Sequence, residues 1–141
     1  MYTRTFIISL FLCLSFGLFA QTVKLQSPDG NISLDINLSG ELSYSVSYRG
    51  TQVIIPSPLG FEFQGEPDMR SGFTLLTTPQ TVLQRDSWTP VVKNKHAQVD
   101  VQWNETHIAL VEKDGEHRRM DLFFRAYDNG IAFRYQLHGS K

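Results

Sequence analysis

The sequence predicts an all-β fold, an antiparallel β-sandwich. Apolar and polar residues alternate over short runs, as at 32–38 and 42–48, which is typical of strands with one buried face. Glycine, proline, asparagine and aspartate lie between the runs, where they form tight turns. No apolar repeat of helical period extends beyond one turn. Many short strands joined by short turns pack best as a sandwich.

Residues 1–20 have the features of a secretory signal peptide. A short start containing Arg4 precedes a continuous apolar run over 5–19, and Ala20 supplies the small residue before a cleavage site. The run is too short for a membrane span. We therefore expect export of residues 21–141, which form one domain.

Cleavage near residue 20 would remove Cys13, the single cysteine, so the exported part would fold without a disulfide. A lipidated Cys13 is disfavoured because Leu12 is bulky where a small residue is expected. The exported part has a small excess of acidic residues. This balance argues against nucleic acid or an anionic membrane surface as a partner.

The first half of the exported part predicts an opening strand at 22–25 and a meander of three further strands at 32–38, 42–48 and 52–55. Short turns between them favour antiparallel pairing, with one face in the core and the other in water. Pro56 and Pro58 are expected to end the meander, because proline cannot donate a ladder hydrogen bond.

The middle of the chain is less regular. A strand is expected at 59–63, and short strands at 73–76 and 81–83. Residues 86–95 read as an irregular polar segment that contains Trp88. Alternation resumes at 97–103 and again at 106–111, and it places Trp103 on a core face with Val99 and Val101.

The chain ends in a hairpin centred on Asn129-Gly130, a pair typical of a type I′ turn because that turn needs positive φ at both central residues. With these two as the loop, Phe124 lies opposite Tyr135 on one face. On the other face Arg125 lies opposite Arg134.

Two arginines directly opposed on a sheet repel each other, so an acidic group must lie near Arg125 and Arg134. The preferred interpretation is an internal salt bridge with a carboxylate such as Asp121 or Asp128. The alternative is a bound anion. We take Arg125, Asp128 and Arg134 as a candidate polar cluster.

No catalytic residue and no metal ligand is assigned from the sequence. Motifs of metalloproteases, phosphate-binding loops, dinucleotide folds and zinc sites are absent from it. The histidines lie among polar neighbours and are expected at exposed positions: His96, His107, His117 and His138.

Trp88 is the candidate for carbohydrate binding, since an exposed ring among Asp86, Ser87 and Thr89 could stack on a sugar. The favoured alternative is packing, either at the end of the sandwich or on another domain, because large aromatic residues dominate buried surfaces.

Residues 124–135, Phe-Arg-Ala-Tyr-Asp-Asn-Gly-Ile-Ala-Phe-Arg-Tyr, resemble the signature of the N-terminal domain of glycoside hydrolase family 97. The segments 25–30, 42–50, 58–60 and 87–91 resemble other parts of that domain in the same order. Asn129 departs from the aspartate that the family often has there.

The resemblance implies a secreted bacterial α-glucosidase or α-galactosidase in the periplasm. Such enzymes combine an N-terminal β-super-sandwich of the galactose-mutarotase type, a catalytic (β/α)8 barrel and a small C-terminal β-domain. The catalytic carboxylates lie in the barrel, and so does most of a calcium site, completed by a glutamate beyond residue 141. A barrel alone takes about 250 residues.

The resemblance therefore implies an N-terminal piece, truncated before the barrel, that is inactive alone. It leaves open that the sandwich lacks its last strands. In the whole enzyme the domain would pack on its own barrel and support the binding of an α-linked oligosaccharide. The alternatives are a stand-alone carbohydrate-binding sandwich and an interaction module of the cell envelope.

Overall fold

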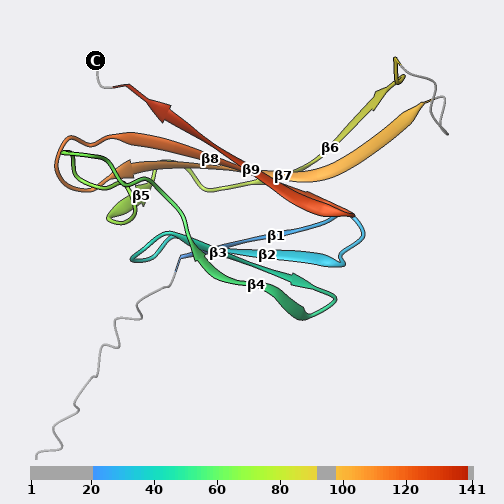
Figure 1. Cartoon of the computed structure of the whole chain (residues 1–141), viewed down its shortest axis with the longest axis horizontal. Helices are drawn as coiled ribbons and strands as arrows, with labels where there is room; N and C mark the ends of the chain where they lie inside the picture. Colours follow the sequence, from blue (N-terminus) through green and yellow to red (C-terminus); the bar gives the residue numbers. More distant parts are fainter. Residues whose placement is uncertain (1–20, 92–97, 140–141) are drawn as a thin grey trace, which may run out of the picture.

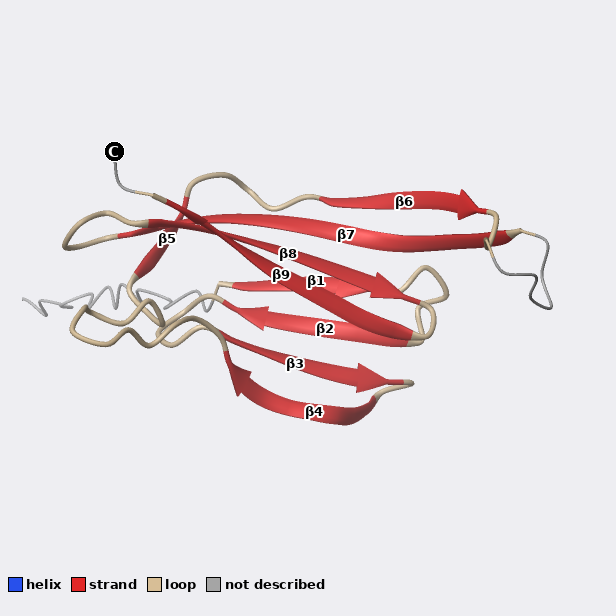
Figure 2. Ribbon diagram, turned by 45° about the horizontal axis from the view of Figure 1, so that its top comes forward, coloured by secondary structure: helices blue, strands red, loops and turns tan. Residues whose placement is uncertain are grey.

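The computed structural model describes residues 21–91 and 98–139, and within these ranges the regular structure is entirely β-strand. Two antiparallel sheets face each other (Figures 1 and 2), which confirms the predicted all-β sandwich. The predicted signal peptide at 1–20 and Ala97 lie outside the described residues.

The smaller sheet has four strands in the order β1-β2-β3-β4 and confirms the predicted meander. Its strands are β1 (Thr22–Gln26), β2 (Ile32–Asn37), β3 (Ser43–Tyr48) and β4 (Thr51–Pro58). Consecutive strands pair through short turns, so nearly all contacts in this sheet are local in sequence.

The larger sheet has five strands and is built around one long strand. Its members are β5 (Phe73–Leu75), β6 (Thr81–Trp88), β7 (Val99–Glu112), β8 (Arg119–Tyr127) and β9 (Gly130–His138). One edge of β7 pairs with β6 and then with β5, the other edge pairs with β8, and β8 pairs with β9.

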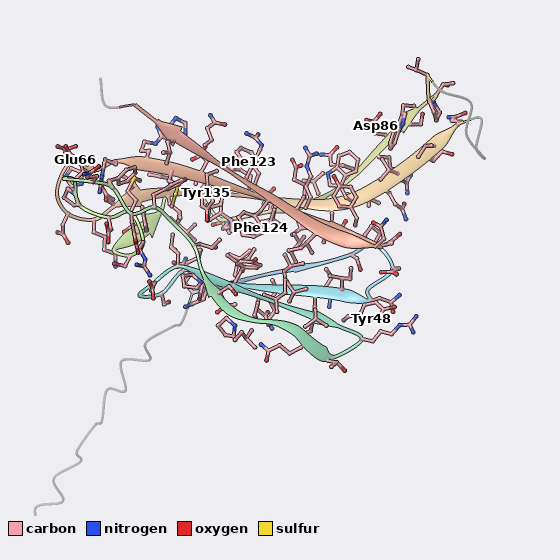
Figure 3. All side chains as sticks on the ribbon, viewed as in Figure 1. Tyr48, Glu66, Asp86, Phe123, Phe124 and Tyr135 are labelled. Carbon is pink, nitrogen blue, oxygen red and sulfur yellow. The ribbon has the colours of Figure 1, made fainter. Side chains whose placement is uncertain are left out.

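The core lies between the two sheets and follows the period-two pattern of the strands. Leu34 and Ile36 face it from β2, Ile108 and Leu110 from β7, and all four are fully buried. Phe124 of β8 is also fully buried. Figure 3 shows Phe124 between the sheets and Phe123 on the opposite side of β8. Each such side chain contributes roughly 1.5–3 kcal/mol of burial free energy.

Two predictions around the prolines are wrong. The strand β4 continues through Pro56 to Pro58, which is possible because β4 is an edge strand with an irregular register. The strand expected at 59–63 is absent, and Phe61 makes only an isolated bridge to Met69.

The irregular segment predicted at 86–95 is also partly wrong, because residues up to Trp88 belong to β6. The strands expected around 97–103 and 106–111 are one continuous strand, β7. Trp103 is not in the core. It shares the outer face of the sheet with Tyr127, and its ring lies 5.5 Å from the Tyr127 ring.

The final hairpin forms, but its predicted register is wrong by two residues. Asp128 and Asn129 are the loop residues, so Phe124 pairs with Phe133. Arg125 consequently pairs with Ala132 and not with Arg134. Asp128, Asn129 and Gly130 do not have positive φ, so the turn is not of type I′.

A contact between loops explains the loop position. The Asp128 carboxylate accepts a hydrogen bond from the backbone N–H of Asp29, at 2.9 Å. This bond ties the β8–β9 turn to the β1–β2 turn of the facing sheet. The predicted assignment of residues to faces is nevertheless correct, because a shift of two residues keeps every side chain on its side.

We expect Gly60→Ala to destabilise the domain far more than Gly65→Ala. Both glycines have positive φ, +115° and +84°, so alanine costs about 1–2 kcal/mol at either site. At Gly60 the added Cβ would also lie 2.1 Å from the Met69 carbonyl oxygen, whereas Gly65 faces open space. Urea unfolding of both variants measures the difference, and equal midpoints would contradict the close approach at Gly60.

Candidate functional site

Trp88 lies at the end of β6, opposite Val99 of β7. It is 50% exposed, so it does not plug the end of the sandwich. The strand β8 reaches only to the level of Trp103, and beyond that point β6 and β7 continue as a two-stranded ribbon (Figure 1). The exposed ring is therefore presented on a projection from the domain.

A groove of ≈ 880 Å³ runs between this ribbon and the β8–β9 turn. Carboxylates, amides, a guanidinium group and one aromatic ring line it, and it is open to solvent. The lining residues are Arg85, Asp86, Ser87, Asp100, Val101, Gln102, Tyr127, Asp128 and Asn129. Hydrogen-bonding groups around an aromatic ring suit a polar ligand such as a sugar.

Arg125 finds its acidic partner on the neighbouring strand, where its Nε donates to the Glu105 carboxylate. The guanidinium also lies 4.9 Å from the centre of the Trp103 ring. Hydrogen bonding to Tyr127, and then to Glu105, raises the pKa of Arg125. Arg125 thus has an internal carboxylate partner, which is Glu105 and neither of the two aspartates considered from the sequence.

Arg134 lies over the Phe123 ring, 3.9 Å from its centre. The other neighbour of Phe123 is His107, whose ring stacks on it at 4.4 Å with an interplanar angle of 5°. The structure therefore gives each member of the candidate polar cluster a different main partner, since Asp128 contacts Asp29.

A second polar group on the same face was not found from the sequence. The Asp121 carboxylate is 10% exposed and has one imidazole on each neighbouring strand. Its Oδ2 lies 3.1 Å from Nε2 of His107 and 3.1 Å from Nε2 of His138. The two histidines are far apart in sequence, so only the strand pairing could reveal this group.

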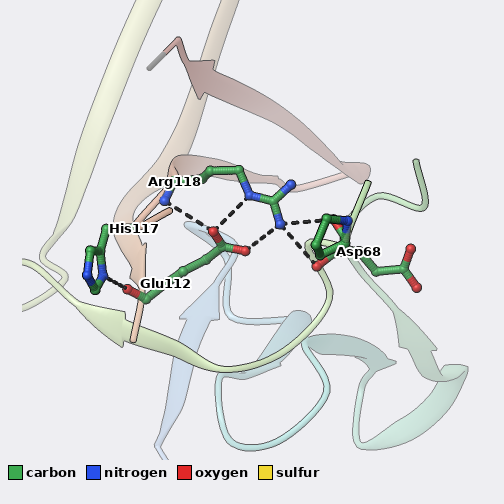
Figure 4. A network of polar contacts seen from close by, with 5 residues as sticks. Asp68, Glu112, His117 and Arg118 are labelled. Carbon is green, nitrogen blue, oxygen red and sulfur yellow. Dashed lines mark hydrogen bonds and ion pairs between the residues drawn. The ribbon is translucent and has the colours of Figure 1, made fainter. Parts of the chain in front are cut away.

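The most extensive polar network joins the β7–β8 turn to the loop at 67–68 (Figure 4). The Arg118 guanidinium donates to both oxygens of Glu112, at 2.7 and 2.8 Å, and to the Pro67 carbonyl oxygen at 2.9 Å. His117 contacts the Glu112 carbonyl oxygen at 3.1 Å. The forked guanidinium thereby fixes a long loop against the sheet.

Three of the four glutamates that could be considered for glycoside hydrolysis, all but Glu66, are paired with arginines. Glu62 pairs with Arg70, and Glu105 and Glu112 pair with the arginines described above. Within residues 21–91 and 98–139, no group of three or more potential ligands is arranged to hold a metal ion.

The profile of the family described as Glycosyl-hydrolase 97 N-terminal matches residues 25–141. The chain belongs to glycoside hydrolase family 97. The match covers nearly all of the chain outside the predicted signal peptide, and it confirms the resemblance stated from the sequence.

Two relatives are named as α-galactosidases. A probable retaining α-galactosidase from Streptomyces bingchenggensis is 34% identical over 110 residues, which is 78% of this chain and 16% of the relative. A retaining α-galactosidase from Bacteroides thetaiotaomicron is 29% identical over 140 residues, 94% of this chain and 19% of the relative.

Two solved structures contain a domain with the same fold. A family 97 enzyme from a Pseudoalteromonas species, in complex with panose, matches with a TM-score of 0.73 and 30% identity over 82% of this chain and 17% of that chain. A β-arabinopyranosidase matches with a TM-score of 0.72 and 26% identity, over 85% of this chain and 19% of the other.

This family 97 chain thus spans less than a fifth of the length of the relatives that it matches. In the part of the chain that the structure describes, no helix is long and apolar enough to cross a membrane.

We expect the ion pair between Glu112 and Arg118 to make the domain sensitive to acid. The Arg118 side chain lowers the pKa of Glu112 below its ordinary value of 4.5, against the effect of burial. A carboxylate whose pKa is lower in the folded state stabilises the domain at pH values above its pKa in the unfolded state. This contribution is lost as the pH falls through its pKa in the folded state. The free energy of unfolding should therefore decrease as the pH is lowered from about 4.5.

Glu112→Gln should lower the free energy of unfolding at pH 7 by about 2 kcal/mol and flatten its acid dependence. Glu116→Gln, at an exposed position in the same turn, is the control and should leave the profile unchanged. Urea unfolding between about pH 3 and pH 7, a range that spans the titration of carboxylates, makes the comparison. Identical profiles for the two variants would rule out the ion pair as the cause.

Proposed function

We propose that this chain is the N-terminal β-sandwich domain of a longer, secreted bacterial glycoside hydrolase. The observation that carries the proposal is the family match over residues 25–141, combined with coverage of only 16–19% of the relatives. The apolar run at 1–19 supports export, and the periplasm is the proposed location.

The proposed substrate is an α-linked oligosaccharide, with α-galactosides and α-glucosides as the two candidates. The relatives named as retaining α-galactosidases support the first. The second rests on the resemblance to the family, which includes α-glucosidases, and panose was bound by one structural relative.

The remainder of the enzyme would supply the chemistry. Catalytic carboxylates must lie on both sides of the scissile bond, and Glu62, Glu105 and Glu112 of this domain are already paired with arginines. We assign the carboxylates and the calcium ion to the (β/α)8 barrel that the family implies. The sandwich would pack on that barrel, and its groove beside β6 and β7 would help to shape the sugar site.

The intact mass of the natural product tests this proposal. A peptide from 118–134 locates the protein in the envelope fraction of source cells, and we expect a mass several times the 16.1 kDa of this chain. The purified 141-residue chain should release no sugar from α-galactoside or α-glucoside substrates. A natural mass equal to that of residues 21–141, or hydrolysis by the chain alone, would overturn the proposal.

A stand-alone carbohydrate-binding module is the second candidate, favoured by the exposed ring of Trp88 beside a polar groove. On this view Trp88→Ala should weaken panose binding to the isolated chain by roughly tenfold or more. Val82→Ala, on the same strand and 51% exposed, is the control. Titration calorimetry decides, and an unchanged affinity in the Trp88 variant removes the main support for this candidate.

A further inference from the structure

The outer edge of β9 is unpaired within the described part of the chain, since β9 bonds to β8 alone. The strand has nine residues and contains no proline, lysine or acid. Its one arginine, Arg134, lies over the Phe123 ring on the outer face of the sheet and does not guard the edge. Long edges without such protection readily accept another strand.

A backbone hydrogen bond between β7 and the start of β8 shows which β9 groups face this edge. The Glu112 N–H donates to the Arg118 carbonyl oxygen at 3.1 Å, so even-numbered residues of β7 bond to β8. Hydrogen bonding alternates along an antiparallel strand, and even-numbered residues of β8 therefore bond to β7 and odd-numbered ones to β9. The ladder register then leaves four β9 residues with N–H and C=O groups on the open side: Ile131, Phe133, Tyr135 and Leu137.

The strands of the two sheets do not all have a counterpart in the facing sheet. Across the interface β1 contacts β7 and β8, and β2 contacts β8. The next strand, β3, lies opposite β9, because the Tyr44 and Phe133 rings are 5.3 Å apart. This order leaves β4, the outermost strand of the smaller sheet, without a strand opposite it (Figure 2).

Apolar side chains remain uncovered at this position. Val53 of β4 is 59% exposed. In the register of β4, Ile54 lies opposite the buried Val46, and Val53 is the extra residue of a bulge. A cavity of ≈ 500 Å³ lies there, and its lining includes Val46, Val53 and Ile131. One more strand beside β9 would lie over this cavity.

We propose that β9 accepts one further antiparallel strand, supplied by the polypeptide that follows residue 141 in the longer enzyme, and that this strand closes the core over Val53. The inference rests on the proposed function, because it needs that longer polypeptide. A returning segment after a short turn reaches the free edge of β9 by the shortest connection. Alternate apolar side chains of the new strand would face Val53, and its backbone would bond to Phe133 and Tyr135.

Hydrogen exchange in the longer protein tests the proposal, read residue by residue after electron-transfer fragmentation. We expect the amides of Phe133 and Tyr135, which face the edge, to exchange as slowly as those of Ala132 and Arg134, which bond to β8. Exchange that is roughly 100-fold faster at Phe133 and Tyr135 would show an open edge and overturn the proposal.

The same experiment at two protein concentrations distinguishes a strand of the same chain from a second copy of the protein at the β9 edge. Protection that is lost on dilution would place a second copy on the edge and also overturn the proposal. The intact mass separates the two levels of inference, because a natural product of only 21–141 defeats the proposed function itself. A longer protein with fast edge amides defeats the strand alone.

A pair of variants in the longer protein supplies a second readout. Val53→Lys should lower the melting temperature of this domain by at least about 2 °C, because the new strand would bury the lysine. Ile55→Lys is the matched control, since Ile55 is 71% exposed on the same strand and is not part of the cavity lining. Equal melting temperatures for the two variants would contradict burial of Val53.

Discussion

The larger sheet depends on the pairing of β7 along both of its edges. Fourteen residues of this strand bond to β5 and β6 on one side and to β8 on the other. Ile108 and Leu110 of β7 face the core, and Trp103, Glu105 and His107 lie on the outer face. A strand that is fixed on both sides also fixes where β8 and β9 lie, and hence where the core can close.

The outer face of this sheet is held together by charges and rings. Glu105 and Asp121 are largely buried there, and each has a cationic or imidazole partner on a neighbouring strand. An unpaired carboxylate in such a position would cost several kcal/mol. These carboxylates are thus committed to the fold, which agrees with the proposal that catalytic groups come from elsewhere in a longer enzyme.

The surfaces that remain are those expected of a domain within a longer protein, as proposed above. Trp88 is presented on a ribbon that projects from the sandwich, a polar groove runs beside it, and β9 keeps an unpaired edge. An isolated domain has little reason to leave hydrophobic side chains and a long strand edge exposed, because both favour aggregation. A domain that is completed and covered by the rest of its chain has no such difficulty.

The sequence by itself determined the fold class, the meander and the face on which most side chains lie, because side chains of a strand alternate with a period of two. It could not determine the pairing of distant strands, so the groove, the Asp121 group and the true partner of Arg125 were all missed. The hairpin shows the difference most clearly. Alternation placed Phe124 on the inner face. The observed turn, in which Asp128 accepts a hydrogen bond from Asp29, pairs Phe124 with Phe133. A shift of two residues leaves the faces unchanged, and only tertiary contacts can decide it.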